Sequence, residues 1–201
     1  MKILLLTGFE PFLHFKINPT AKIVEMLDKK IVNGFQVSGH VLPVDYDASG
    51  DEIIRLIDEI QPDAVVALGL AGGRRHITPE RIAINCNASD EPDNAGNRPR
   101  GERIDSEGPD GIFSTLPIQQ MVEKLHEAGF PASISNSAGT YLCNHVMYRV
   151  LHRFQSNDQQ IPAGFIHIPA SHELAIDHGR IPSWSQDDLT EAVRICLQSI
   201  H

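Results

Sequence analysis

Short apolar runs alternate along the chain with longer segments in which apolar residues recur at helical spacing. Uninterrupted apolar runs of this length are typical of strands buried on both faces of a sheet, and the longer segments are typical of amphipathic helices. The predicted strands cover residues 3–6, 37–44, 64–68, 82–84, 133–135 and 164–168. Because strands and helices alternate, we expect an α/β protein in which one sheet carries helices on both faces, formed by a single domain over residues 1–201.

Start signals precede most of the amphipathic segments. Asn18 is followed by Pro19, which pairs an N-cap residue with proline at the first helical position, and Ile23, Met26 and Leu27 then share one stripe. A second predicted helix follows a capping box of Ser49 with Glu52, and a third covers residues 118–127 and stops before Gly129. A fourth carries its apolar residues at helical spacing, and a fifth begins near Ser185 or Asp187. The apolar residues of the fourth are Val146, Val150, Leu151 and Phe154.

Residues 86–111 interrupt this alternation. The segment is rich in Asp, Asn, Gly, Pro and Arg and has no apolar period that would hold it against a core. Loops of this length inside a compact domain are usually functional or disordered. We predict a partly ordered flap beside the active site; a plain mobile loop is the alternative.

Composition excludes several classes of function. The 201 residues carry a formal net charge of -9, so nucleic acid or an anionic membrane surface would be repelled. The apolar run that begins at Ile3 ends at Thr7, too short for a signal-peptide core or a membrane span. Three cysteines without a Cys-x-x-Cys pair fit neither a disulfide framework nor a zinc site. We therefore expect a cytoplasmic protein with no metal and no cofactor.

Cys143 is the cysteine in the most informative setting. A turn of small residues, 135–140, leads from a predicted strand to the helical pattern that begins at Val146. This places the sulfur near a helix N-terminus, where free backbone N–H groups favour a thiolate and can bind an oxyanion. The alternative is a small apolar thiol packed under a helix, and Cys196, which lies within an amphipathic stripe, is interpreted in that way.

His167 is the preferred partner among the ten histidines. It ends an apolar strand whose carboxyl end should open onto the same crevice as the start of the Cys143 helix. His145 lies two residues after Cys143 and would point to a different helix face. A buried, hydrogen-bonded core histidine is the alternative interpretation of His167.

A Cys–His pair is commonly completed by an acidic or amide residue that fixes the imidazole tautomer. Glu80, which lies just before a predicted strand, is the candidate for this third residue. The alternative interpretation is that Glu80 forms a surface ion pair with a neighbouring arginine. The sequence has no His-Glu-x-x-His, P-loop or Gly-x-Gly-x-x-Gly pattern.

Several ordered motifs together resemble the pyroglutamyl peptidase I family, also called pyrrolidone carboxyl peptidases. They run nearly end to end and comprise Thr7-Gly8-Phe9-Glu10-Pro11-Phe12, Asn18-Pro19, Gly72-Gly73-Arg74, Ile77-Thr78-Pro79-Glu80-Arg81, Pro92-Asp93-Asn94, Ser114-Thr115-Leu116-Pro117, Cys143-Asn144-His145-Val146-Met147-Tyr148 and Gly164-Phe165-Ile166-His167-Ile168-Pro169. The resemblance implies a cysteine peptidase that cleaves after an N-terminal pyroglutamyl residue of peptides. It also implies a three-layer α/β/α sandwich around a twisted mixed sheet, and a homotetramer.

By the same resemblance, the catalytic triad is Glu80, Cys143 and His167. The residues assigned to substrate binding are Phe9, Phe12, Asn18, Leu70, Ala71 and Leu142. Aromatic faces suit a flat neutral lactam, whose amide would bind backbone groups around Leu70 and Ala71. We expect such a pocket to reject a free glutamyl terminus, because the charges of that terminus would be left unpaired.

Three positions depart from the family pattern. Leu13-His14 replaces the usual Gly-Gly, Leu70 replaces glutamine, and Asp90-Glu91 replaces an Arg-Ile pair associated with the oxyanion and the apolar pocket. These departures leave two alternatives open. One is a relative with altered specificity for the N-terminal acyl group; the other is a non-catalytic homologue that binds a lactam or peptide.

Overall fold

A computed structural model of the chain describes residues 1–13 and 15–201. It contains a six-stranded sheet with the strand order β2-β3-β1-β4-β10-β5. These strands are β1 (Lys2–Phe9), β2 (Ile31–Val32), β3 (Phe35–Leu42), β4 (Ala64–Leu70), β5 (Thr78–Pro79) and β10 (Ala163–Ile168). The inner strands β3, β1, β4 and β10 are mutually parallel, whereas the short edge strands β2 and β5 run antiparallel to their neighbours. The predicted mixed sheet is confirmed.

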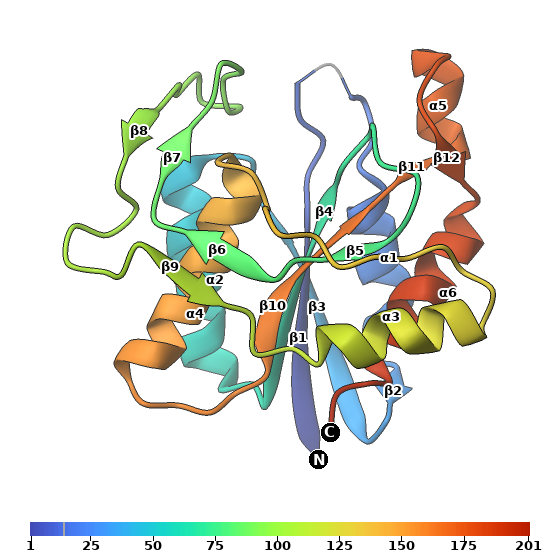
Figure 1. Ribbon diagram of the computed structural model, residues 1–201, viewed down its shortest axis with the longest axis horizontal. Helices are drawn as coiled ribbons and strands as arrows, with labels where there is room; N and C mark the ends of the chain where they lie inside the picture. The colour runs from blue at the N-terminus through green and yellow to red at the C-terminus, as the bar shows by residue number, and fades with distance from the viewer. Residues whose placement is uncertain (14) are drawn as a thin grey trace.

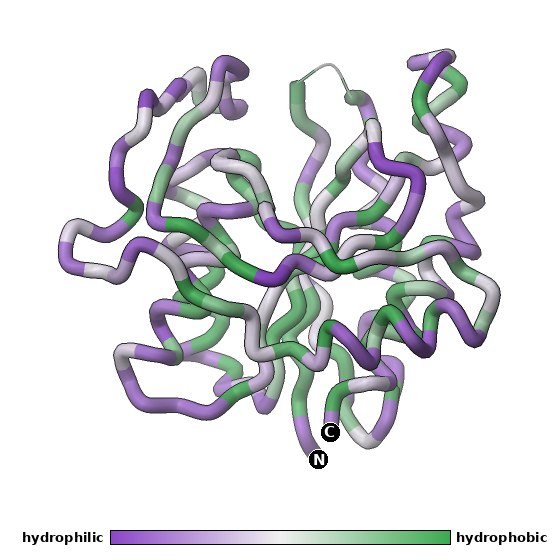
Figure 2. The backbone as a smooth tube through the Cα atoms, viewed as in Figure 1, coloured by the Kyte–Doolittle hydropathy of each residue, from purple (hydrophilic) through white to green (hydrophobic). Residues whose placement is uncertain are grey.

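Helices cover both faces of this sheet, as Figure 1 shows. They are α1 (Pro19–Leu27), α2 (Tyr46–Ile60), α3 (Ile118–Glu127), α4 (Leu142–Ser156), α5 (His172–His178) and α6 (Gln186–Leu197). Leu4 and Leu6 of β1 point into the core shared with α1, α3 and α6, whereas Leu5 points into the core shared with α2 and α4. Figure 2 shows hydrophobic residues concentrated along the central strands. The three-layer α/β/α arrangement follows, and no helix of the described residues is long and apolar enough to cross a membrane.

Two helix predictions have different outcomes. Asn18 caps α1 as predicted, because its side chain accepts a hydrogen bond from the Thr20 N–H. The predicted capping box at Ser49 is wrong. α2 already begins at Tyr46, where Asp45 is the N-cap and accepts from Ala48 N–H, and Ser49 lies buried inside the helix. An aspartate just before an apolar residue is as strong a start signal as the box pattern.

Of the predicted strands, 133–135 is wrong, whereas 82–84 is confirmed as a strand but does not belong to the main sheet. Residues 133–135 form no strand, and Ala132 and Ser135 make isolated bridges to the segment around β5. β6 (Ile82–Ile84) exists, but it pairs with β9 (Gly111–Phe113) in a separate two-stranded sheet. The predicted strand at 37–44 runs from Phe35 to Leu42. The predicted set did not include the two-stranded sheet of β11 (Ala170–Ser171) and β12 (Ser183–Trp184), nor α5.

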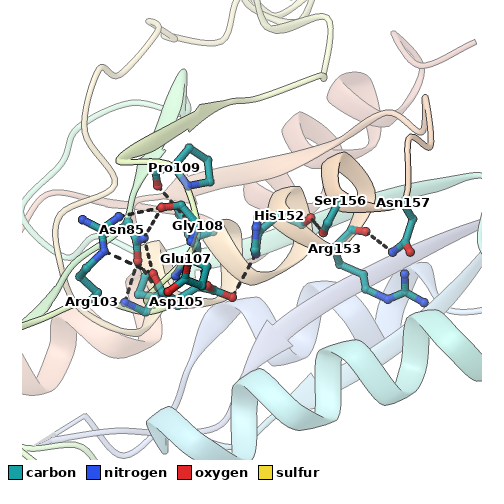
Figure 3. Close-up of polar contacts among 12 residues, drawn as sticks. Asn85, Arg103, Asp105, Glu107, Gly108, Pro109, His152, Arg153, Ser156 and Asn157 are labelled. Atoms are coloured by element: carbon teal, nitrogen blue, oxygen red, sulfur yellow. Dashed lines mark hydrogen bonds and ion pairs between the residues drawn. The ribbon is translucent and has the colours of Figure 1, made fainter.

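The polar segment 86–111 is built on a hairpin of β7 (Asn87–Ala88) and β8 (Arg100–Glu102). Its second half folds around the buried Asn85. The Asn85 side-chain oxygen accepts from the N–H groups of Ile104 and Asp105, and its amide donates to the carbonyls of Asp105 and Gly108. Figure 3 shows this loop beside α4, where Asp105 Oδ2 lies 3.4 Å from Nδ1 of His152. Polar contacts therefore attach the segment to α4, which also carries Cys143.

Candidate active site

A pocket of about 170 Å³ lies at the carboxyl edge of the parallel strands, where α4 begins. Its walls come from β1, β4, β10, the first turn of α4 and the loops that follow β1 and β3. The lining residues are Phe9, Phe12, Asn18, Val44, Leu70, Ala138, Tyr141, Leu142, Cys143 and His167. The lining thus combines a nucleophile and an imidazole with mostly apolar walls, and none of the described residues that form it is a carboxylate.

Cys143 is the second residue of α4, so its sulfur lies beside the first turn of the helix. The Tyr141 N-cap makes no side-chain capping bond, and its hydroxyl donates to the Pro92 carbonyl at 2.9 Å. A β-carbon at position 69 would lie 2.8 Å from the Cys143 sulfur and 2.7 Å from the Phe165 ring. Gly69 is therefore needed for β4 to approach the thiol this closely. Since Gly69 is the register partner of His167, the thiol and the imidazole are brought to the same part of the sheet.

His167 is held from behind by a buried carboxylate. Its Nδ1 lies 2.7 Å from Oε1 of Glu80, which is completely buried. Arg74 donates to the same Glu80 oxygen at 2.7 Å, also contacts the Thr78 hydroxyl, and reaches the Ser137 carbonyl at 3.3 Å. The predicted pairing of Glu80 with His167 is therefore present. The alternative of a surface ion pair is wrong, because the arginine partner is Arg74 and the carboxylate has no exposed surface.

Burial raises the pKa of the Cys143 thiol to about 12, and the nearby Glu80 charge acts in the same direction. The Arg74 charge and a backbone hydrogen bond at Cys143 lower the pKa, but by less. The sequence argument predicted a net lowering, and this is wrong. It included the helix N-terminus but not the cost of removing a thiolate from water. Burial therefore favours the protonated thiol of Cys143 over the thiolate in the free protein at neutral pH.

The two partners of the thiol also have shifted pKa values. Burial opposes ionisation of Glu80, but hydrogen bonds from His167, Ser135 and Arg74 outweigh it and lower the carboxyl pKa. Burial lowers the pKa of His167, and the Arg74 charge adds to this, although Glu80 raises it. The resting site thus holds an ionised Glu80 and a neutral His167. With Nδ1–H donated to Glu80, the remaining nitrogen of His167 is free to accept a proton.

Most residues predicted to bind substrate line this pocket. Phe9, Phe12, Asn18, Leu70 and Leu142 all contribute to its wall. The Asn18 oxygen is occupied by Thr20 and its amide donates to the Glu10 carbonyl, so it positions the wall as well as lining it.

Ala71 lies just outside the pocket lining. Its N–H bonds Ile168 and its carbonyl accepts from Arg74, so its role in binding stays a prediction. Sequence reasoning missed Val44, Ala138 and Tyr141. Tyr141 could have been inferred from its place two residues before Cys143.

Among the positions that depart from the family pattern, Leu70 lines the pocket, whereas Leu13, Asp90 and Glu91 are not among the lining residues. The Asp90 side chain is fully exposed and lies 3.6 Å from Arg100. Glu91 is also exposed. The pKa of Tyr141 is raised to about 12, mainly by burial and then by the charges of Asp93 and Cys143, and the Glu91 charge makes the smallest contribution. Leu13 is exposed and has a φ of 52°, a region that favours glycine. His14 lies outside the described residues.

The remaining cysteines and His145 do not belong to the pocket. All three cysteines are unpaired, and Cys196 is buried in the core as predicted. His145 packs against Tyr46, and its Nδ1 lies 3.1 Å from the Asn87 oxygen. A larger hollow of about 430 Å³ around Lys2 and His201 contains no cysteine. Within residues 1–13 and 15–201, no group of three His, Cys, Asp or Glu side chains is placed to hold a metal ion.

Comparison with known proteins identifies relatives of the whole chain and of its fold. The family model described as pyroglutamyl peptidase matches residues 1–201. The pyrrolidone-carboxylate peptidase of Oceanobacillus iheyensis is 58% identical over 198 residues, covering 98% of each chain, and that of Halalkalibacterium halodurans is 48% identical over 199 residues, also covering 98% of each. Among solved structures, a mutant pyrrolidone carboxyl peptidase from P. furiosus superposes with a TM-score of 0.95 at 44% identity, covering 98% of this chain and 97% of that one. The pyrrolidone carboxyl peptidase of Thermococcus litoralis gives a TM-score of 0.95 at 38% identity, covering 99% and 93%.

Proposed function

The chain belongs to the pyroglutamyl peptidase family, and from this premise we propose that it hydrolyses the amide bond after an N-terminal pyroglutamyl residue of peptides. The observation that carries the proposal is the pocket itself, where Cys143 and His167 meet an apolar wall that includes Phe9 and Phe12. A neutral five-membered lactam is a suitable occupant, because aromatic faces favour flat uncharged rings.

In the proposed first step, the Cys143 thiol gives its proton to His167 as the sulfur attacks the scissile carbonyl. The proton moves in this step because the thiol is not ionised at rest. The resulting imidazolium is stabilised by Glu80, 2.7 Å from Nδ1. Backbone N–H groups in the first turn of α4 bind the oxyanion of the tetrahedral intermediate. The intermediate collapses to a thioester as His167 returns the proton to the departing amine.

In the second step, water attacks the thioester carbonyl while His167 removes a proton from it. The second tetrahedral intermediate expels the sulfur, which recovers its proton from His167. The products are free pyroglutamate and a peptide shortened by one residue, and the site returns to its neutral thiol and neutral imidazole. No redox change or external cofactor is required by this sequence of steps.

Specificity in this proposal comes from the absence of charge in the pocket lining. A glutamyl terminus carries an ammonium and a carboxylate, and neither would find a counter-ion among Phe9, Phe12 and Leu70. The lactam form has neither charge, so it loses less hydration free energy on entry. Discrimination should therefore appear mainly as a difference in kcat/KM between the two termini.

The test is hydrolysis of pyroglutamyl p-nitroanilide, compared with the prolyl and glutamyl p-nitroanilides, in the presence of a reductant. We expect turnover of the pyroglutamyl substrate alone, lost in Cys143→Ala and retained in the matched control Cys86→Ala. Equal rates for wild type and Cys143→Ala between pH 6 and 9 would exclude the proposed chemistry. Preference for the prolyl substrate would instead show that the lactam carbonyl is not recognised.

We also propose that the peptidase is a cytoplasmic homotetramer. The support is the resemblance to the family together with three unpaired cysteines, as expected in a reducing compartment. Sedimentation equilibrium should give about four times the mass of the 22.2 kDa chain, and cell fractionation should recover the activity with cytoplasmic markers. A monomer mass at micromolar concentration would contradict the tetramer.

A further inference from the structure

Arg74 joins the parts of the candidate active site from outside the pocket. It follows the turn after β4, where its N–H donates to the Ala71 carbonyl. Its guanidinium donates to Glu80 Oε1, contacts the Thr78 hydroxyl and reaches the Ser137 carbonyl. The Ser137 carbonyl belongs to the segment that leads into α4 and Cys143. One cation thus contacts the strand before Glu80, the carboxylate itself and the approach to the nucleophile.

The same carboxylate oxygen is shared by Arg74 and His167. Both nitrogen atoms lie 2.7 Å from Glu80 Oε1, so the guanidinium fixes the oxygen to which the imidazole must point. Thr78 adds a second link, because its hydroxyl contacts Arg74 and donates to the His167 backbone carbonyl at 3.4 Å. A planar guanidinium can make these contacts together, which a single ammonium cannot reproduce fully.

Charge gives Arg74 a further effect. Glu80 is wholly buried, and its negative charge disfavours formation of a thiolate at Cys143. Arg74 opposes that effect at Cys143, and it also disfavours protonation of His167 in the free protein. Without the guanidinium, the pKa of His167 would rise, which favours the imidazolium, and an imidazolium cannot accept the thiol proton.

From this geometry we propose that Arg74 is a positioning residue of the active site, holding Glu80 ionised and aimed at His167 while offsetting its charge at Cys143. The inference rests on the proposed function for its catalytic meaning. It assigns no contact between Arg74 and substrate, because Arg74 is not among the residues that line the pocket. Its loss should therefore lower kcat and leave KM nearly unchanged.

The test compares Arg74→Gln, Arg74→Lys and the control Arg81→Gln. Glutamine keeps hydrogen-bond donors for Glu80 and Thr78 but removes the charge, whereas lysine keeps the charge. Arg81 is a matched neighbour, because it is exposed and its side chain bonds Asn136. Two profiles are measured from pH 5 to 10: kcat/KM for pyroglutamyl p-nitroanilide, and the rate of Cys143 alkylation by iodoacetamide in a Cys86→Ala background.

We expect Arg74→Gln to move the acid limb of kcat/KM to higher pH, because His167 then keeps its proton longer. Its alkylation rate at pH 8 should fall about tenfold for each unit that the thiol pKa rises. Arg74→Lys keeps the charge, so the pH midpoints of both profiles should stay close to wild type, as they should in Arg81→Gln. Equal profiles for Arg74→Gln and Arg74→Lys would overturn the inference, as would a loss of activity in Arg74→Gln with both profiles unmoved.

The alkylation profile separates this inference from the proposed function. It requires no turnover, so it reports on Arg74 even if no pyroglutamyl substrate is cleaved. Should Arg74→Gln fail to fold, Arg74→Lys alone still tests the inference. A displacement of its alkylation profile by a full pH unit would contradict a role based on charge.

Discussion

Replacing Glu80 with glutamine tests whether Cys143 and His167 rest as a neutral thiol and imidazole or as a thiolate–imidazolium pair. The hydrogen bonds from Arg74 and His167 both converge on Glu80 Oε1, so a glutamine can present its carbonyl oxygen there and keep the His167 tautomer. The perturbation therefore removes the charge and little of the geometry. A hydrogen bond to a charged group contributes about 1.5–3 kcal/mol, and each 1.36 kcal/mol corresponds to a tenfold change in rate. Because Glu80 is fully buried, we expect kcat to fall by about 10- to 10²-fold.

The same substitution should make the thiol more reactive toward iodoacetamide. The Glu80 charge raises the Cys143 pKa, so neutralising the carboxyl group lowers it and increases the thiolate fraction at a given pH. The assay follows p-nitroaniline release and Cys143 alkylation on one preparation of Glu80→Gln from pH 6 to 9. We predict slower turnover with faster alkylation. A parallel fall of both rates would refute the reasoning, because it would mean that Glu80 maintains a preformed thiolate–imidazolium pair.

The remaining predictions concern the pocket wall, stability and the exposed departures from the family pattern. Phe12→Ala should raise KM about tenfold with little change in kcat, because the ring is a wall of the pocket and contacts no reacting group; steady-state kinetics with unchanged KM would contradict this. Burial lowers the pKa of His145 from 6.5 to about 4, so between these values the unfolded state binds the extra proton and stability is lost as pH falls. Because one pKa unit corresponds to 1.36 kcal/mol, the free energy of unfolding should fall by about 3 kcal/mol by pH 4. Urea unfolding should show a smaller fall in His145→Gln. Asp90→Asn should change kcat/KM less than about twofold, because an exposed charge outside the pocket is well screened; a tenfold change would place Asp90 near the substrate.

Local signals were enough to predict the layers of the fold. The Asn18-Pro19 start and the 118–127 segment give α1 and α3 at the expected residues, because capping and amphipathic periodicity act within one or two turns. The 133–135 segment shows the limit of such reasoning. The Ser133 N–H donates to Ile77 and the Ser135 N–H to Pro79, yet this pairing gives only isolated bridges beside β5 and no continuous strand. Pairing is a tertiary property and is absent from a local pattern.

The candidate site was predictable to a similar depth. The position of Cys143 at a helix start and of His167 at a strand end followed from the local sequence. The register that places Gly69 opposite His167 did not, because it depends on how β4 and β10 align. Arg74 was missed as a partner of Glu80 because the turn between them brings together residues six positions apart. The predicted direction of the Cys143 pKa shift was wrong because burial of the thiol depends on all the residues that form the pocket.

The central claim is that Cys143 attacks a pyroglutamyl carbonyl while the lactam ring occupies the pocket. A crystal structure of the protein with an aldehyde analogue of pyroglutamate tests this directly, because a thiol adds reversibly to an aldehyde and mimics the first tetrahedral intermediate. The account predicts a covalent bond from Cys143 Sγ to the aldehyde carbon, with the ring against Phe9 and Phe12 and His167 still bonded to Glu80. An analogue bound elsewhere, or one in the pocket with its carbonyl directed away from the sulfur, would contradict it.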